Sequence, residues 1–407
     1  MISEVLVNDR PAMNGALFEV VERKGLGHPD TICDLVAERV SYDLGQYYLK
    51  TCGRVLHYNV DKALLAGGAS KPRFGGGELV ESPRFYLGDR AVSFFDGRNL
   101  ELDEVIQASI SSWLNENLRF LRLGENLVWK NEIKQGSATL NAVEDRGVSN
   151  DTSAGVGYWP PSDLEEMTLS VERHMNSPAF KARHPETGED IKAMSIRRGK
   201  DVEIVLACAM VDKFIADVPD YMEKKASVVS DVRSFLKSEY SDQYRLSLTM
   251  NALDDPSQKQ DGIYLTVTGL SCESGDSGQV GRGNRVSGLI SFMRPQSMEA
   301  WAGKNFKTHV GKIYNFAAQS LARIITENVP EAGEATVTLV GKIGFPVHQP
   351  PYIFTDIRTK AAHDLKIREK AQTVLNAAID AGTIFQPEFL FSEIPPHLMQ
   401  DKKEKRP

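Results

Sequence analysis

The sequence predicts an α+β or α/β fold in which helices cover one side of the β-sheets. Two kinds of segment, found throughout the chain, support this fold class. Apolar residues recur at helical spacing in several long segments, and β-branched or continuous apolar runs, some broken by glycines, lie among them. The chain has 407 residues, which is enough for two or three domains rather than one core.

The first predicted helix covers residues 30–48, and Pro29 suits its first turn. Its apolar residues recur at helical spacing: Ile32, Leu35, Val36, Val40, Leu44 and Tyr47. The next segment, 54–69, has β-branched and apolar runs broken by paired glycines, which predicts strands. A second helix is predicted over 104–117, where apolar residues again recur at helical spacing.

In the middle of the chain, the continuous apolar run of residues 201–211 predicts a buried strand. A further strand is predicted over 262–270. It is followed by a glycine-rich, polar segment, 271–288, that no regular element would tolerate. Two helices and the strand between them complete the prediction: 309–327, 359–381 and 335–344.

Composition excludes several classes of function. The formal net charge is -7, which argues against a nucleic-acid partner because such a surface needs a broad basic face. No run approaches the roughly 18 apolar residues of a membrane span, and we expect neither a signal peptide nor a membrane partner. The cysteines form no CxxC pair, so we expect no zinc ribbon or disulfide framework and a reducing cytoplasm: Cys33, Cys52, Cys208 and Cys272.

The segment GLGHPD places His28 directly before the first predicted helix. Its glycines would let the backbone approach a ligand, and the helix N-terminus would direct free N–H groups and a positive dipole end toward an anion. Asp30 is also what an ordinary helix cap requires. From residue types alone, a capped helix with a satisfied histidine is as good an interpretation as an anion site.

The segment GDSGQVGRGNR combines flexible backbone with forked donors. Arg282 and Arg285 suit phosphate oxygens, and Asp276 could hold a divalent cation between them. It is not a Walker A loop, because the GK[ST] ending is missing. The alternative is a surface hairpin loop with solvated charges.

A third segment, SMEAWAGKNFKTHVGK, concentrates cations at the start of a predicted helix. It contains Lys304, Lys307, His309 and Lys312. A polyanionic ligand would explain them in an acidic protein, whereas a solvated helix end is the alternative. In GEDIKAM, Asp190 lies beside Lys192, a pair that is uninformative alone.

Two polar segments, KQGSATL and SNDTSAGVGY, suit either the edge of a nucleotide pocket around Asp151 or ordinary turns. Asn59 and Asp61 lie on or beside a strand. Burying a carboxylate there is costly without a partner, which could be a cation, a substrate ammonium group or an arginine.

Taken in chain order, these motifs together resemble the archaeal-type (class 2) S-adenosylmethionine synthetases. The matching segments are GLGHPDTICD, FGGG, NDTSAGVG, DIKAM and GDSGQVGRGNR, followed by SMEAWAGKN and HVGKIYN. The resemblance runs from about Glu22 to about Pro351. GHPD alone is short, but with VGRGNR and GKN at these distances it is highly specific.

The resemblance implies an enzyme that joins ATP and L-methionine, releases triphosphate and hydrolyses it to pyrophosphate and phosphate, with Mg²⁺ and K⁺ as cofactors. It implies that His28 faces the oxygen between C5′ and the triphosphate. The implied catalytic residues are His28, Lys192, Arg282 and Lys304. The implied ATP and triphosphate contacts are Gln135, Gly136, Ser137, Asp151, Asp190, Arg285, His309 and Lys312. The resemblance assigns Asp276 to methionine, and Asp30 and Asp276 to the metal. Our assignment of Asn59 and Asp61 to methionine or a monovalent cation comes from their position.

The resemblance also implies three similar β-α-β-β-α-β-type units around a pseudo-threefold axis, and a homodimer or tetramer with sheets packed face to face. We place the units approximately at 1–140, 141–270 and 271–407, with interleaving. Lys134 and Thr139 depart from the family pattern, in which a glycine and an aspartate are usual. A diverged regulatory subunit that binds nucleotide without turnover is therefore an alternative, and a general ATPase is a weaker one.

Overall fold

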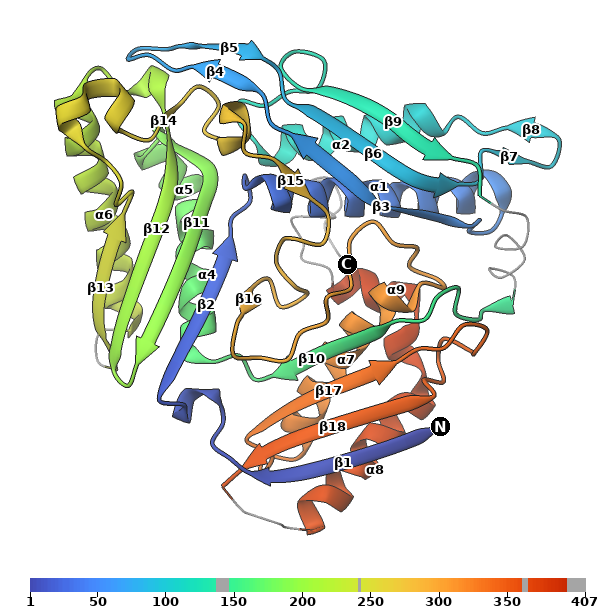
Figure 1. Cartoon of the computed structure of the whole chain (residues 1–407). Coiled ribbons are helices and arrows are strands. Elements are labelled where there is room, and N and C mark those ends of the chain that lie inside the picture. The colour runs from blue at the N-terminus through green and yellow to red at the C-terminus, as the bar shows by residue number, and fades with distance from the viewer. Residues whose placement is uncertain (137–145, 241–242, 361–364, 394–407) are drawn as a thin grey trace.

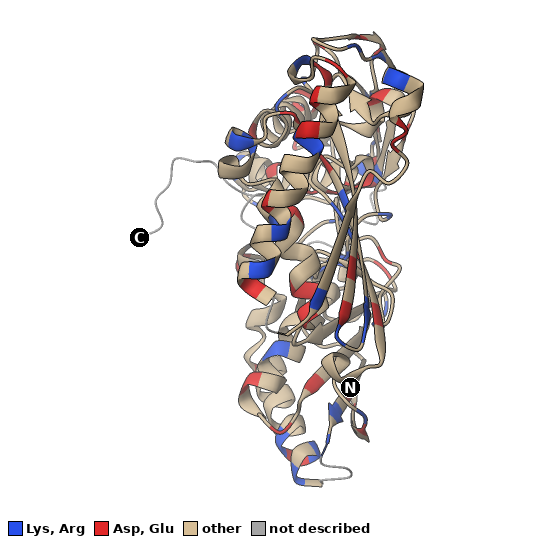
Figure 2. Cartoon of the chain, turned by 90° about the vertical axis from the view of Figure 1, so that its left-hand side faces the viewer, with Lys and Arg blue, Asp and Glu red and all other residues tan. Residues whose placement is uncertain are grey.

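The computed structural model describes residues 1–136, 146–240, 243–360 and 365–393. Three separate mixed sheets surround a central loop region (Figure 1), and each is backed by two long helices. Seen from the side, the sheets form one layer and the helices another, with positive and negative side chains interspersed over the helices (Figure 2). This arrangement confirms the predicted α+β class with helices on one side of the sheets.

The first sheet, here called the β3 sheet, has the strand order β15-β3-β6-β9 and packs on α1 and α2. Its strands are β3 (Tyr58–Ala66), β6 (Arg84–Ala91), β9 (Val128–Lys134) and β15 (Gly278–Gln279). Its helices are α1 (Pro29–Cys52) and α2 (Leu102–Asn117). Two small hairpins lie outside it: β4 (Ala69–Lys71) with β5 (Glu78–Glu81), and β7 (Phe94–Phe95) with β8 (Arg98–Asn99).

The second sheet, the β11 sheet, has the order β13-β12-β11-β2-β16, and β14 pairs with β12. Its strands are β2 (Phe18–Lys24), β11 (Thr187–Arg198), β12 (Asp201–Val211), β13 (Arg245–Met250), β14 (Leu265–Thr266) and β16 (Ile290–Ser291). Helices α4 (Asp163–Met175) and α6 (Val218–Tyr240) pack on this sheet, and the short α5 (Pro178–Arg183) packs on α4.

The third sheet, the β17 sheet, joins the two ends of the chain, because β1 pairs in parallel with β18. Its order is β1-β18-β17-β10. The strands are β1 (Ile2–Asp9), β10 (Ala154–Trp159), β17 (Glu334–Val340) and β18 (Tyr352–Thr359). Helices α7 (Val310–Asn328) and α8 (Leu365–Ala381) pack on this sheet, and α9 (Pro387–Glu393) packs on α7. Among the helices of the described residues, none combines the length and apolar character that crossing a membrane requires.

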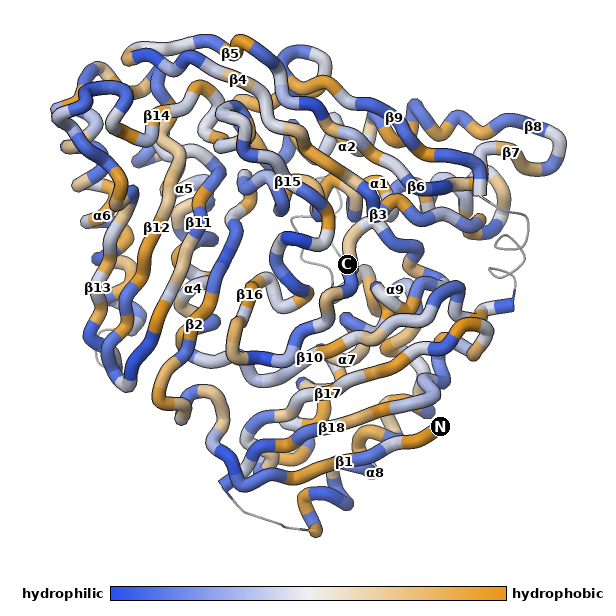
Figure 3. Tube along the Cα trace, in the orientation of Figure 1, coloured by the Kyte–Doolittle hydropathy of each residue, from blue (hydrophilic) through white to orange (hydrophobic). Residues whose placement is uncertain are grey.

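The side of the sheets opposite the helices is open. Hydropathy alternates along many of the strands (Figure 3), so that one face packs on the helices and the other remains exposed. Apolar side chains on this open face come from all three sheets, and include Leu6, Phe18, Leu64, Val128 and Phe354. Exposed apolar side chains on strands of all three sheets suit a surface for contact with another molecule.

Most of the predicted elements are present. The helices predicted over 30–48, 104–117 and 309–327 are confirmed as α1, α2 and α7. The predicted helix over 359–381 begins later, because residues 352–359 form β18, and α8 starts at Leu365.

Two strand predictions need correction. Residues 201–211 do form a strand, but burial alternates over most of its length, so one face is open. The strand predicted over 262–270 is reduced to Leu265–Thr266. Carboxylates take the backbone amides around it: Asp254 accepts from Tyr264 N at 3.2 Å, and Glu273 accepts from Val267 N and Thr268 N at 2.6 Å each.

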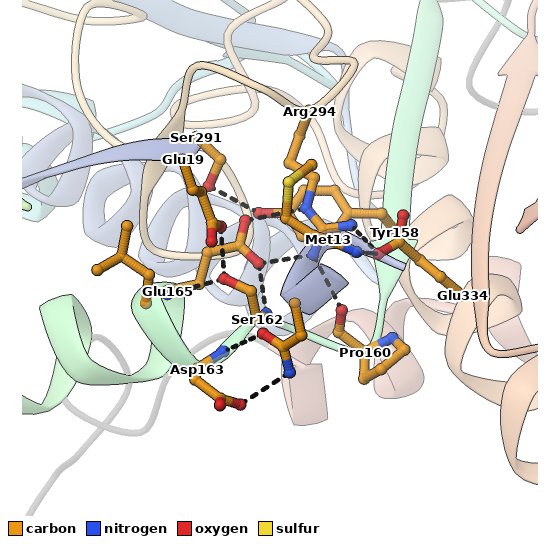
Figure 4. Close-up of polar contacts among 12 residues, drawn as sticks. Met13, Glu19, Tyr158, Pro160, Ser162, Asp163, Glu165, Ser291, Arg294 and Glu334 are labelled. Carbon is orange, nitrogen blue, oxygen red and sulfur yellow. Dashed lines mark hydrogen bonds and ion pairs between the residues drawn. The ribbon is translucent and has the colours of Figure 1, made fainter. Parts of the chain in front are cut away.

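A buried ionic network ties the central loop to the surrounding elements (Figure 4). Arg294 binds Glu165 of α4 through two hydrogen bonds of 3.1 and 2.8 Å, and its Nη1 lies 2.7 Å from Glu334 Oε2 on β17. Its guanidinium also lies over the Tyr158 ring, 4.2 Å from the centroid. The side chains of Arg294, Glu165 and Glu334 are at most 2% exposed, so this junction fixes the central loop between the β11 and β17 sheets.

Candidate active site

His28 caps the N-terminus of α1. Its Nδ1 accepts a hydrogen bond of 3.2 Å from the Asp30 backbone N–H, which places the proton of a neutral imidazole on Nε2. Burial lowers the pKa of His28 to about 4, against the opposing effect of Asp30. The histidine is therefore both a cap and a neutral N–H donor at a helix N-terminus.

The glycines before His28 have a different purpose from the one predicted. Gly25 and Gly27 donate backbone hydrogen bonds of 2.8 and 2.9 Å to Ile191 and Glu189 in β11. A Cβ atom at Gly27 would lie 2.5 Å from the backbone N of Asp190. These glycines permit close contact with β11, rather than access for a ligand, and they bring Asp190 beside the start of α1.

Asp30 links α1 to the glycine-rich segment. Its Oδ1 accepts a hydrogen bond of 2.9 Å from Gln279 N, and its Oδ2 lies 2.8 Å from Lys24 Nζ. Lys24 also donates to the carbonyl oxygen of Arg282 at 2.7 Å. Asn284 completes this connection, because its side-chain amide bonds both the N–H and the C=O of Lys24. Residues about 250 positions apart are thereby fixed beside His28.

Asp190 and Asp276 form an acidic pair near His28. The Ser271 hydroxyl contacts Oδ2 of both, at 3.1 Å for Asp276, and Ser271 N donates to Asp190 at 2.9 Å. Burial raises the pKa of Asp190 to about 6, and the nearby Asp276 acts in the same direction. Asp190 is buried and Asp276 is exposed, so only the latter faces solvent directly.

Two predicted cations at this end of α1 are accessible. Lys192 is 41% exposed and lies 3.3 Å from Glu22, and Arg282 is exposed. Arg285 differs: its guanidinium donates to the carbonyl oxygens of Gly281, Gly283 and Ser297. We call this group the α1 cluster: His28, Asp30, Asp190, Lys192, Asp276 and Arg282.

A cavity of about 700 Å³ opens beside the α1 cluster at Lys192. Its walls come from β11, β12 and the segment before β14, and include the apolar side chains of Met194, Val205 and Ile263 together with Tyr264. A cavity of this volume with mostly apolar walls and a cation at its edge suits a flat base attached to an anionic group.

A second group of predicted residues lies at the start of α7, here called the α7 cluster: Asn59, Asp61, Asp151, Lys304, His309 and Lys312. Lys304 Nζ lies 3.2 Å from Asp61 and also bonds Glu299 and the Ala300 carbonyl. The buried carboxylate Asp61 is thus paired with the side chains of Lys304 and Lys62, protein cations in place of the arginine considered from the sequence. The Asn59 amide N–H₂ bridges Asp61 and Asp89 at 2.9 and 2.8 Å, while its buried Oδ1 has no hydrogen-bond partner among the described residues.

His309 caps α7 with the same geometry as His28. Its Nδ1 accepts from Gly311 N at 3.2 Å, and Nε2 lies 3.5 Å from Asp151. Burial, helped by the nearby charge of Lys304, lowers the pKa of His309 to about 3. Lys312, one turn into the helix, forms an ion pair of 2.7 Å with Glu38, and both side chains are 1% exposed.

Three carboxylates along α1 connect the two clusters. Asp30, Asp34 and Glu38 are four residues apart, so they lie on one helix face. They accept backbone hydrogen bonds from Gln279, Gly281 and Gly303 at 2.9, 2.8 and 3.0 Å. Eight residues of helix rise about 12 Å, so this row holds the loop carrying Arg282 and Lys304 along two turns of α1.

The whole described chain matches known proteins of one family. The family model for S-adenosylmethionine synthetase (AdoMet synthetase) matches residues 4–391. The chain belongs to the S-adenosylmethionine synthetase family. A probable S-adenosylmethionine synthase of Aquifex aeolicus is 43% identical over 86% of this chain and 88% of its own length. The S-adenosylmethionine synthase of Pyrobaculum neutrophilum is 39% identical over 95% and 98%.

A solved structure shares the fold. An unusual S-adenosylmethionine synthetase from Campylobacter jejuni superposes with a TM-score of 0.60 and covers 95% of this chain and 92% of its own, at 15% sequence identity. Family membership confirms the resemblance predicted from the motifs and makes the chain a methionine adenosyltransferase, whose substrates are ATP and methionine.

Other residues assigned from the resemblance to the S-adenosylmethionine synthetases lie elsewhere or outside the described part. Gln135 accepts hydrogen bonds from the backbone N–H and hydroxyl of Ser93, and Gly136 follows it beside His57. Ser137 and Thr139 fall outside the described residues. Lys134 is 73% exposed and lies 3.3 Å from Glu132, so its charge is largely solvated.

Sequence reasoning missed four residues that organise the synthetase site: Lys24, Asp34, Glu38 and Asn284. The four-residue spacing of acids on an otherwise apolar helix was the available signal for Asp34 and Glu38. Nothing local to Lys24 or Asn284 marks their contact, because it joins positions 260 residues apart.

Proposed function

We propose that this enzyme transfers the adenosyl group of ATP to the sulfur of methionine, releases triphosphate, and hydrolyses it to pyrophosphate and phosphate. In the first step, the sulfur attacks C5′, and the C5′–O bond breaks with its electron pair leaving on the triphosphate. The observation that carries the proposal is the neutral His28 donor at a helix N-terminus, with exposed Lys192 and Arg282 nearby.

In this proposal, His28 Nε2–H donates to the oxygen between C5′ and the triphosphate as charge develops there. Its low pKa supports hydrogen-bond donation without proton transfer. The N-terminus of α1 adds positive potential at the same place. Arg282 and Lys192 hold the departing triphosphate, and the cavity beside Lys192 accepts the adenine ring near Asp190.

Lys304 and Lys312 can make their predicted contacts with the triphosphate only if they exchange their carboxylate partners for phosphate oxygens. Both side chains are at most 2% exposed and are paired with Asp61, Glu299 or Glu38. His309 and Asp151 stand at the edge of the same group. Arg285 contributes through the loop, because it holds the carbonyl groups on both sides of Arg282. The orphaned Asn59 Oδ1 and Asp61 would receive the methionine ammonium group.

Magnesium fits Asp276 better than Asp30. Among the described residues no group of three or more His, Cys, Asp or Glu side chains could hold a metal ion alone. Magnesium commonly uses one or two carboxylates with substrate phosphates and waters, and exposed Asp276 beside Asp190 meets that need. Both oxygens of Asp30 already have protein partners. When bound, Mg²⁺ would neutralise phosphate charge. We also propose K⁺ as the monovalent cofactor, as the family resemblance implies.

We also propose a homodimer, or a tetramer formed by two such dimers, with three related units in each chain and sheets packed face to face between chains. The open apolar face formed by the three sheets supports this, because a large exposed apolar surface marks an interface. We also place the enzyme in the cytoplasm. Because assembly stabilises the folded chain, dilution of such a dimer should lower its stability.

An assay with purified enzyme tests the proposal. ATP, methionine, Mg²⁺ and K⁺ should yield S-adenosylmethionine, pyrophosphate and phosphate in equal amounts. Arg282→Ala should slow triphosphate hydrolysis more than S-adenosylmethionine formation, with Arg233→Ala, at an exposed arginine of α6, as control. A folded dimer that binds ATP without forming product would instead support the regulatory subunit, and phosphate release without methionine would support a general ATPase.

A further inference from the structure

The start of β11 departs from regular sheet pairing where it reaches the α1 cluster. Residues 191–198 pair with β12 without interruption, and the next pair toward the start of the strand is Thr187 with Met210. Three residues of β11 thus lie opposite one residue of β12, and we call them the β11 bulge: Gly188, Glu189 and Asp190. A bulge beside an active site commonly re-aims a side chain, and the side chain at this end of the bulge is that of Asp190.

The main chain of the β11 bulge has partners outside β12. The Glu189 carbonyl oxygen accepts hydrogen bonds from Gly27 N at 2.9 Å and from the side chain of Asn176, the C-cap of α4, at 3.2 Å. Lys181 of α5 donates to the Gly188 carbonyl oxygen at 2.6 Å. These bonds fix the main chain of the bulge against the segment before α1 and against the helices of its own sheet.

Arg119 binds the same region from another part of the fold. It lies two residues after the end of α2, which packs on α1 behind the β3 sheet. Its Nε bonds Glu189 Oε1, its Nη2 bonds the Thr187 carbonyl oxygen, and its Nη1 bonds the Pro185 carbonyl oxygen at 3.1 Å. Because the guanidinium is planar and all three of its nitrogens are engaged, it fixes the direction of the bulge as well as its distance.

Aromatic packing holds the Arg119 side chain in place. Its guanidinium carbon lies 4.9 Å from the centroid of the Phe120 ring, and Lys213 Nζ lies 3.6 Å from the same centroid. The Phe120 ring is 6.3 Å from that of Phe214. Lys213 and Phe214 directly follow β12, so the loop after α2 is docked on the β11 sheet with its arginine oriented.

The ion pair of Arg119 and Glu189 is poorly suited to a purely stabilising role. The Glu189 side chain is 4% exposed, and among the described residues its Oε2 has no hydrogen-bond partner. Burial of an unsatisfied carboxylate oxygen costs free energy, and apolar residues of similar volume often stabilise a fold at least as well as a buried ion pair. The place of the pair, directly before Asp190, gives it a different purpose.

We propose that Arg119 is a positioning residue, which holds the β11 bulge so that the Asp190 carboxylate stays directed at Ser271 in the ATP site. The main-chain bonds fix the carbonyl oxygen of Glu189, whereas Arg119 fixes the Glu189 side chain and the residues that enter the bulge. The inference rests on the proposed function, in which Asp190 lies beside ATP, and extends it to a residue outside the α1 cluster.

Calorimetric titration of the full chain with ATP and Mg²⁺, together with steady-state kinetics, tests the inference. Arg119→Met should lower ATP affinity and kcat/KM for ATP by about 10- to 100-fold, the scale expected for a misplaced contact group. Arg119→Lys should recover only part of this loss, because an ammonium group lacks the planar fork. In Asp190→Asn, Arg119→Met should lower ATP affinity much less, since the side chain that Arg119 positions is already altered.

Arg197 provides a matched control at the opposite end of β11. Like Arg119, it bonds one carboxylate, that of Glu19, and two backbone carbonyl oxygens. Arg197→Met combined with Glu19→Gln should lower the free energy of unfolding, measured with urea, but keep the ATP affinity of the parent. Arg119→Met combined with Glu189→Gln avoids an unpaired buried charge, so it tests the inference even if the single variant does not fold. It should show the same loss of ATP affinity.

Two results would overturn the inference. One is parental ATP affinity in the folded Arg119 variants, and the other is an equal loss of affinity from Arg119→Met in the parent and in Asp190→Asn, which a purely structural role would give. Failure of the proposed function would look different, because a parent that binds ATP would then form no S-adenosylmethionine. The ATP affinities of the variants decide the inference in that case as well.

Discussion

Two histidines, His28 and His309, cap α1 and α7 with the same geometry, yet their surroundings differ. Each Nδ1 accepts a 3.2 Å hydrogen bond from the backbone N–H two residues ahead. Burial lowers both pKa values, to about 4 and about 3. Around His28, Arg282 and Asp276 are exposed, whereas around His309 the cations Lys304 and Lys312 are buried against carboxylates.

The comparison teaches that the cap itself does not define a catalytic group. A histidine Nδ1 satisfies a helix N-terminus at both places, so the neighbouring charges decide what else each histidine can do. At α1 two of the neighbouring charged side chains, Arg282 and Asp276, are exposed to a ligand, whereas at α7 the two lysines are engaged in buried pairs. We therefore expect changes at His28 to affect mainly chemistry, and changes at His309 and at the buried pair of Lys312 and Glu38 to affect mainly stability.

The largest effect on stability is expected from Lys312, near the start of α7. Lys312→Met would leave Glu38 buried without its cation, and we expect a loss of about 3–5 kcal/mol in the free energy of unfolding. Urea denaturation measures it. Lys312→Met combined with Glu38→Gln should recover most of this loss, because glutamine can still accept from Gly303 N. A loss below about 1 kcal/mol for the single variant would show that the pair is not a buried charge pair.

At the α1 end, His28→Ala should lower the rate of sulfonium formation by about 10²- to 10³-fold, the usual cost of removing a donor aimed at developing charge. Single-turnover kinetics measures this step. His28→Asn separates the two roles, because asparagine caps helices well but does not place a donor where Nε2 lies. His28→Asn should therefore be more stable than His28→Ala, while its rate of sulfonium formation stays as low. A normal rate in His28→Ala would leave His28 as a cap alone.

The sequence predicted elements best where the apolar pattern was dense. In α1 sixteen of the residues are buried, and the helix was predicted within a few residues of its ends. In α6 only Tyr221, Val228, Val232 and Leu236 are buried, so the apolar stripe is too sparse to predict a helix. For α4 a local signal existed, since Ser162 and Glu165 form a capping box.

The candidate site shows a different limit of sequence analysis. The motifs named residue types suited to an anion site, and the structure brings His28, Asp190, Asp276 and Lys192 together. What joins them is long-range: Lys24 to Arg282, and Gln279 to Asp30. Such contacts depend on tertiary packing, which also explains why the glycines before His28 were assigned to a ligand instead of to β11.

Asp34, which lies between Asp30 and Glu38 on α1, should make the free energy of unfolding depend on pH. Burial raises the pKa of Asp34 to about 7, against about 3.9 in an unfolded chain. Between these values the folded state holds a proton that the unfolded state lacks, so stability falls as pH rises through this window and is constant above about 7. From pH 5 to pH 8, Asp34→Asn should gain up to about 3 kcal/mol relative to the parent.

Denaturation of both proteins at several pH values measures this difference. Asp380→Asn, at an exposed position of α8, controls for the loss of a carboxylate and should show the same pH dependence as the parent. A constant difference between Asp34→Asn and the parent across this range would mean that Asp34 stays ionised, held by Arg285 and the Gly281 N–H.

The smallest effect separates the two caps directly. His309→Ala removes the acceptor for Gly311 N and should cost about 1 kcal/mol of unfolding free energy, as for other helix caps. The rate of sulfonium formation should change far less than in His28→Ala, because the cations beside His309 are paired within the protein. His309→Asn should restore the lost stability. If His309→Ala instead slowed the reaction as much as His28→Ala, the α7 cluster would have to open during turnover, with Lys304 and Lys312 exchanging their carboxylates for phosphate.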